Sequence, residues 1–263
     1  MDYNYHTHTD RCGHATGDDE QYVRAAIDAG FKVIGFSDHI PFKNVIHPSE
    51  RMNYDQLEDY IQSIESLKVK YKDQIDVKLG FELEYFPEYN AYYKELLDRC
   101  DYLICGQHNK VLDKYSYDQF TNDEDVLVYA SQVKAAIESG LISFVAHPDY
   151  FMIGRRSWSK SCEEAVHMIA KAAQVHHVAL EINLNGIRYG KSTYDGKLAY
   201  PYPFRPFWEI VSQYNVQCLY SFDAHKPYTL LEKERIELVE EILKDLNLSI
   251  NHSYRILYDE TTD

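Results

Sequence analysis

The chain has 263 residues, enough for one domain with a large buried core and no need for disulfide bonds. Its formal net charge of −15 disfavours nucleic acid and anionic lipid as partners, because an acidic surface repels both. The first residues lack the basic and apolar regions of a signal peptide, and no apolar window is long enough to span a membrane. The five cysteines are dispersed and odd in number, so we expect reduced thiols in a cytoplasmic protein.

Short apolar runs alternate with amphipathic segments along the whole chain. The runs predict strands at residues 3–8, 32–39, 76–82, 102–108, 141–147, 177–183 and 216–225. Helical spacing of apolar residues predicts helices at residues 18–29, 54–71, 87–99, 123–139, 161–175, 204–214 and 231–246. The polar segments 109–122 and 184–201 are expected to be loops, the first of them a cover for the active site, and residues 249–258 a short tail.

This alternation indicates βα units and a parallel sheet, which is either an open doubly wound sheet or a closed barrel. Six of the seven apolar runs end near a His, Asp or Glu, and the run 177–183 ends in Asn183. A closed barrel brings all these ends to one face, where barrel enzymes hold their active sites, whereas an open sheet would spread them along an edge. We therefore predict an α/β protein with a (β/α)7 TIM-like barrel, a single domain over residues 1–263.

The side chains at these strand ends are those that bind metal ions. His6 and His8 lie two residues apart, so an extended strand projects both imidazoles from the same face. Each candidate alone has an ordinary explanation, such as a solvated strand edge or a hydrogen-bonded core histidine. Gathered at one barrel end they would repel one another unless metal ions bound them. The candidate ligands are His6, His8, His14, His39, Glu82, His108, His147, Asp223 and His225.

The motifs around these residues resemble those of the PHP (polymerase and histidinol phosphatase) superfamily. They are His6-Thr7-His8, Ser37-Asp38-His39, Gly80-Phe81-Glu82, His147-Pro148-Asp149 and the segment from Ser221 to Pro227. The similarity is closer to the histidinol-phosphate phosphatase branch, through Cys12-Gly13-His14-Ala15, the segment Glu181 to Arg188, and Tyr200-Pro201. Two stretches depart from the family pattern, namely Gly106-Gln107-His108 and Asn183-Leu184-Asn185-Gly186.

The resemblance implies a distorted barrel that holds three divalent metal ions, and Zn, Fe and Mn all suit such ligands. One ion would take His6, His8, Glu82 and Asp223; a second would share Glu82 and add His108 and His147; a third would take His14, His39 and His225. It also places Glu82, Asp223 and His225 at the catalytic centre, where a hydroxide that bridges two metals attacks phosphorus. Arg188 resembles the family's phosphate-binding arginine, and Arg155 and Arg156 are further candidates for that role.

The implied activity is hydrolysis of L-histidinol phosphate in histidine biosynthesis, with a small phosphomonoester as substrate and neither nucleic acid nor a membrane as partner, while the oligomeric state stays open. The positive charge of three divalent ions exceeds the negative charge of Glu82 and Asp223. This excess favours an anionic substrate. The alternative enzyme is a phosphoesterase acting on nucleotides or other small phosphate esters. A metal-storing protein and an amidohydrolase are less favoured, the latter because no lysine lies at a strand end. Asp149 could donate a proton to the leaving group or hold an imidazole in place, and the sequence does not choose.

Overall fold

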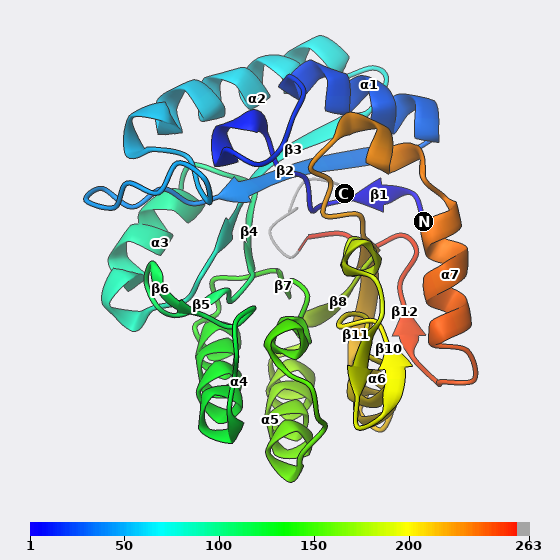
Figure 1. Ribbon diagram of the computed structural model, residues 1–263. Coiled ribbons are helices and arrows are strands. Elements are labelled where there is room, and N and C mark those ends of the chain that lie inside the picture. The colour runs from blue at the N-terminus through cyan, green and yellow to red at the C-terminus, as the bar shows by residue number, and fades with distance from the viewer. Residues whose placement is uncertain (257–263) are drawn as a thin grey trace.

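A curled sheet of parallel strands forms the centre of the computed structural model, which describes residues 1–256, and helices cover its outside (Figure 1). The strands, in spatial order, are β1 (Tyr3–Asn4), β2 (Val33–His39), β3 (Asp76–Leu83), β4 (Tyr102–Cys105), β7 (Phe144–Val145), β8 (Ala179–Asn183), β11 (Gln217–Ser221) and β12 (Ser249–Ile250). The helices are α1 (Asp19–Ala29), α2 (Leu57–Tyr71), α3 (Asn90–Leu97), α4 (Asp123–Glu138), α5 (Lys160–His176), α6 (Arg205–Val211) and α7 (Glu234–Ile242).

The segments that follow β1 and β11 meet just beyond the carboxyl ends of these strands and close the sheet there. Thr7 forms a parallel bridge with Ala224. The backbone N–H of His8 donates to the Ala224 carbonyl at 3.0 Å, and the N–H of Ala224 donates to the His6 carbonyl at 3.0 Å. This contact rules out the open doubly wound sheet and confirms the predicted barrel of seven βα units.

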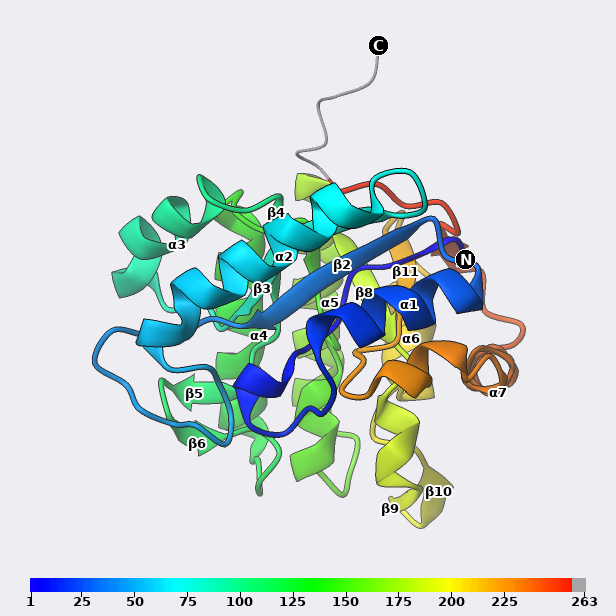
Figure 2. The ribbon, with the colours of Figure 1, turned by 90° about the horizontal axis from the view of Figure 1, so that it is seen from above.

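Three regions differ from the sequence prediction in detail. The two expected loops contain antiparallel hairpins, β5 (Asn109–Val111) with β6 (Lys114–Ser116) and β9 (Ser192–Tyr194) with β10 (Lys197–Ala199). Figure 2 shows both hairpins on the same side of the molecule. The expected tail contributes the short strand β12, which pairs with β11, and its last two predicted residues, 257 and 258, lie outside the described part of the chain.

Local sequence signals explain where helix α1 begins and ends. At the start of α1, the Asp18 side chain accepts the Gln21 backbone N–H while the Gln21 side chain accepts that of Asp18, a capping box. Gly30 ends the same helix in the left-handed conformation, with φ of 84°.

Within residues 1–256, no helix combines the length and the hydrophobicity that crossing a bilayer requires.

A cluster of tyrosines fills the barrel beneath the carboxyl ends of the strands. Tyr3, Tyr5 and Tyr102 are fully buried, and the Tyr102 hydroxyl lies 2.6 Å from the Tyr5 carbonyl and 3.0 Å from that of Phe36. The Tyr102 ring fits because β3 has a glycine beside it: a Cβ on Gly80 would lie 2.5 Å from Tyr102 Cζ. The barrel interior is therefore a packed core that supports the polar end, and not a pore.

We expect Gly80→Ala to lower the free energy of unfolding by about 1–3 kcal/mol, because the added methyl group overlaps a rigid ring in a packed core. Urea denaturation measures the change. In a Tyr102→Leu background the methyl group has room, so the double variant should lose less than the sum of the two single losses. Additive losses would show that the glycine does not accommodate the ring.

Candidate metal centre

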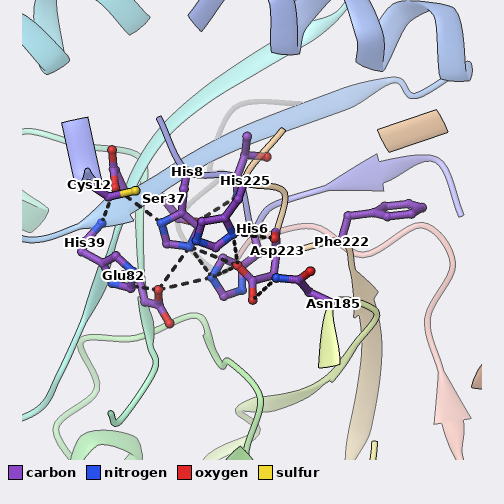
Figure 3. Close-up of polar contacts among 12 residues, drawn as sticks. His6, His8, Cys12, Ser37, His39, Glu82, Asn185, Phe222, Asp223 and His225 are labelled. Atoms are coloured by element: carbon purple, nitrogen blue, oxygen red, sulfur yellow. Dashed lines mark hydrogen bonds and ion pairs between the residues drawn. The ribbon is translucent and has the colours of Figure 1, made fainter. Parts of the chain in front are cut away.

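The carboxyl ends of the strands bring predicted ligands together, and Figure 3 shows six of them: His6, His8, His39, Glu82, Asp223 and His225. His6 and His8 flank the bridging residue Thr7 on an extended segment, so both rings point to the same side and their Nε2 atoms are 3.1 Å apart. His39 is the last residue of β2, and Glu82 lies opposite it in the register of β3. The ring centroid of His225, which follows β11, is 4.2 Å from that of His8.

Glu82 is the central residue of the cluster, with each carboxylate oxygen facing different histidines. Its Oε2 lies 3.3 Å from His6 Nε2, 3.4 Å from His8 Nε2 and 3.1 Å from His39 Nδ1. Its Oε1 lies 2.9 Å from His147 Nε2 and 3.7 Å from His108 Nε2. Gly106 makes this position available, since a Cβ there would overlap Glu82 Oε1.

Asp223 is the second carboxylate, on the opposite side of His8. Its Oδ1 lies 3.2 Å from His8 Nε2, 3.6 Å from His6 Nε2 and 3.3 Å from His225 Nδ1. Its backbone adopts a positive φ of 46°, a conformation that costs a non-glycine residue energy and is found at functional sites. The amide groups of Asn183 and Asn185 both lie 3.3 Å from the other oxygen, Oδ2, and leave Oδ1 to the histidines.

His14 lies at the exposed edge of the cluster, 4.7 Å from the ring centroid of His225 and 5.6 Å from that of His39. Its Nδ1 faces two carbonyl oxygens, that of Cys12 at 3.0 Å and that of Ser49 at 3.1 Å. Carbonyl oxygens only accept, so Nδ1 carries the proton and the lone pair is on Nε2. His14 thus presents Nε2, and not Nδ1, to a ligand.

The buried polar atoms of this cluster fit divalent cations. Glu82 Oε2 and Asp223 Oδ1 are buried without a hydrogen-bond donor. Burial would raise the pKa of each carboxyl group, but neighbouring histidines, His6 first, hold both pKa values well below the usual range. Burial lowers the pKa of His39 and of His225, which favours their neutral forms. For His6, His8 and His147 the neighbouring carboxylates outweigh burial and raise the pKa, so a cation would have to displace protons there. Ionised carboxylates and neutral imidazoles are the donor set of Zn, Fe and Mn sites.

Two further carboxylates orient the histidines, and the sequence prediction assigned them no role. Glu181 is fully buried in β8 and accepts the His6 Nδ1–H at 2.7 Å and the His147 backbone N–H at 2.7 Å. Asp38 Oδ1 lies 3.4 Å from His8 Nδ1. A charged residue in the middle of an apolar strand was the available signal for Glu181. Such partners fix the tautomer of a metal-binding imidazole.

The cluster forms the floor of a cavity of about 220 Å³. Of the predicted arginines, Arg188 lies in its wall, and the guanidinium sits 4.9 Å above the Tyr189 ring. Arg155 and Arg156 are not among the lining residues. The Arg155 guanidinium is buried against Asp123, with Nη2 2.8 Å from Oδ1, and that of Arg156 donates to the Ile153 carbonyl on the surface.

Two other residues bear on the sequence prediction. Arg51, which the sequence did not single out, also lines the cavity, and its Nη2 lies 2.7 Å from Glu84 Oε2.

Asp149 does not line the cavity. Its Oδ2 accepts the Phe204 backbone N–H at 2.7 Å and the Trp208 indole N–H at 3.0 Å, so it tethers the segment after β7 to the start of α6. This arrangement favours a structural role for Asp149 over proton donation.

We expect chelation to lower the melting temperature, and Zn or Mn to restore it, because without cations Glu82 Oε2 and Asp223 Oδ1 are buried with no hydrogen-bond partner. A ligand at about 100 times its Kd stabilises the folded state by about 2.7 kcal/mol. Thermal melts of chelated and reloaded protein measure the effect. Identical melting temperatures would contradict the presence of a cation site.

Glu181→Gln should weaken metal binding by about 10- to 100-fold, because the amide is a poorer acceptor for the His6 Nδ1–H. Titration of the apoprotein with Zn by calorimetry gives the affinity. Glu164→Gln, an exposed glutamate on α5, removes the same charge and should bind Zn like the unchanged protein. Equal affinities for all three proteins would rule out the orienting role of Glu181.

Comparison with known proteins identifies the family. The PHP domain model matches residues 4–185. The chain is 27% identical to a probable histidinol-phosphatase of Deinococcus radiodurans, covering 84% of this chain and 85% of that protein. It is 25% identical to one of Schizosaccharomyces pombe, covering 87% and 82%.

Solved structures share the fold. The structure of histidinol phosphate phosphatase from Lactococcus lactis, complexed with Zn, L-histidinol and phosphate, superposes with a TM-score of 0.71 at 18% identity, covering 95% of both chains. The family model covers well over half of this chain, including the segments that carry His6, His39, Glu82 and His147. The chain belongs to the PHP domain family.

Proposed function

We propose that this protein is a metal-dependent phosphomonoesterase that hydrolyses L-histidinol phosphate to L-histidinol and phosphate. The observation that carries the proposal is a single small cavity that combines a histidine and carboxylate cluster with Arg188 in its wall. Relatives in Deinococcus radiodurans and Schizosaccharomyces pombe are named probable histidinol-phosphatases, and the Lactococcus lactis structure holds Zn, L-histidinol and phosphate. These names support the choice of substrate.

We assign the chain's ligands to three divalent cations. His6, His8, Glu82 and Asp223 hold the first, Glu82, His108 and His147 the second, and His14, His39 and His225 the third. The His6, His8 and Asp223 ligand atoms lie within 4.8 Å of one another, which supports the first group. When bound, such cations supply a hydroxide nucleophile at neutral pH and neutralise charge on a phosphoryl group.

The protein's own residues bind and orient the ester. Arg188 donates N–H groups to the phosphate oxygens, a geometry that suits the planar guanidinium. Tyr189 holds the guanidinium in place through its ring and through its hydroxyl, which lies 3.1 Å from Arg188 Nη2. Glu82, Asp223 and His225 line the cavity at the catalytic centre, next to the place where the phosphoryl group would bind. Tyr150 and Tyr202 flank His147 and limit the access of water from that side.

We also propose that residues 1–263 act as one phosphoesterase domain. Asp223 and His225 lie beyond the residues that the family model matches, yet they belong to the same cluster as His6 and His8.

The five cysteines are all unpaired, which supports a reducing compartment such as the cytoplasm.

The metal-loaded protein should release inorganic phosphate from L-histidinol phosphate, lose the activity on chelation, and regain it with Mn, Zn or Fe. The cations are expected to be essential because they supply the nucleophile. A phosphate-release assay with mononucleotides as competing substrates separates this function from the nucleotide alternative. No turnover with any of the metals, or faster hydrolysis of nucleotides, would overturn the proposal.

Arg188→Ala should lower kcat/KM for L-histidinol phosphate by about 10- to 100-fold, the worth of hydrogen bonds from a charged donor. Arg156→Ala is the matched comparison, because that guanidinium donates to the Ile153 carbonyl outside the cavity. We expect it to change kcat/KM less than about two-fold, as surface substitutions usually do. Equal losses in the two variants would count against Arg188 as the phosphate ligand.

A further inference from the structure

One carboxylate in the wall of the cavity has no positive partner. Four acidic residues line the cavity, and two of them, Glu82 and Asp223, belong to the metal cluster. The carboxylate of Glu50 lies 2.9 Å from His47 Nδ1. The carboxylate of Asp118 is exposed, and within residues 1–256 it forms neither an ion pair nor a hydrogen bond.

The backbone on both sides of Asp118 is held firmly. Tyr117 is buried, its N–H donates to the His108 carbonyl at 2.8 Å, and its hydroxyl lies 2.6 Å from Gln132 Oε1. On the other side, the Gln119 carbonyl packs so closely on Gly154 that a Cβ there would overlap it. The backbone that carries Asp118 is therefore fixed, and a bound ligand has to order only the short side chain.

A wall of tyrosines connects Asp118 with Arg188. Burial, and then the charge of Asp118, raise the pKa of Tyr150 well above its usual value. The ring centroid of Tyr150 is 6.1 Å from that of Tyr202, which in turn is 5.7 Å from that of Tyr189 under the Arg188 guanidinium. The cavity thus has a cationic end, an aromatic wall and an anionic end.

An unpaired carboxylate works against the binding of a simple phosphate ester, because it repels the phosphate dianion inside a small cavity. A substrate that carries its own ammonium group removes this repulsion and adds a charge-assisted hydrogen bond. We propose that Asp118 binds the ammonium group of the substrate and makes the enzyme selective for phosphate esters of amino alcohols. This inference rests on the proposed function, since L-histidinol phosphate is such an ester.

The test compares two substrates that differ only in the ammonium group, L-histidinol phosphate and the phosphate ester of 3-(imidazol-4-yl)propan-1-ol. At about pH 8 the imidazole of either substrate is neutral, because its ordinary pKa is about 6.5. Asp118→Asn keeps the size of the side chain and removes its charge. Glu124→Gln, an exposed glutamate of α4, is the control for loss of one negative charge elsewhere.

We expect the unchanged enzyme and Glu124→Gln to prefer L-histidinol phosphate by about 10- to 100-fold in kcat/KM, the worth of a charged hydrogen bond. Asp118→Asn should lose this preference through a higher KM for L-histidinol phosphate, with kcat little changed and the melting temperature retained. A preference that survives in Asp118→Asn would overturn the assignment of Asp118 while leaving the proposed function intact. No turnover of either substrate by the metal-loaded enzyme would overturn both.

Discussion

The Glu82 carboxylate is the interaction on which the polar end of the barrel depends. It lies within 3.7 Å of a nitrogen of each of five histidines, which come from four segments of the chain. Such a group is stable in a buried place only if positive charge balances it, since an isolated buried carboxylate is strongly disfavoured. Partly protonated histidines are one source of that charge, but they would repel one another. Divalent cations satisfy the carboxylate and the imidazoles together, so metal binding and the stability of this end of the barrel are linked.

Barrel closure makes this arrangement possible. The bridge between Thr7 and Ala224 aligns the segment that carries His6 and His8 with the segment that carries Asp223 and His225. The same bridge fixes the register of the two segments, and a shift of one residue would turn both histidines of the first segment away from the cluster. The buried tyrosines below act as the support, because a well-packed interior resists such shifts.

Under the proposed function, the distribution of charge in the cavity offers a way to select a particular phosphate ester. Metal ions and Arg188 would attract any phosphate, so they would supply affinity without discrimination. Selectivity requires a feature that disfavours the wrong esters, and the free carboxylate of Asp118 has that property. The aromatic wall between the two charged ends suits a flat, apolar group such as an imidazole ring.

The sequence by itself determined the order of strands and helices and most of the nine candidate ligands, because strand periodicity and the position of a polar residue at a strand end are local properties. His6 and His8 had to share a face, whatever the rest of the chain did. Only the tertiary structure showed which of these arginines lines the cavity: Arg155 and Arg188 both lie in loops after strands, yet Arg155 pairs with Asp123 while Arg188 packs on Tyr189 in the cavity wall. It also brought Glu181 beneath His6, 175 residues away along the chain. Loop paths and partners of this kind result from contacts between distant segments, which no local pattern encodes.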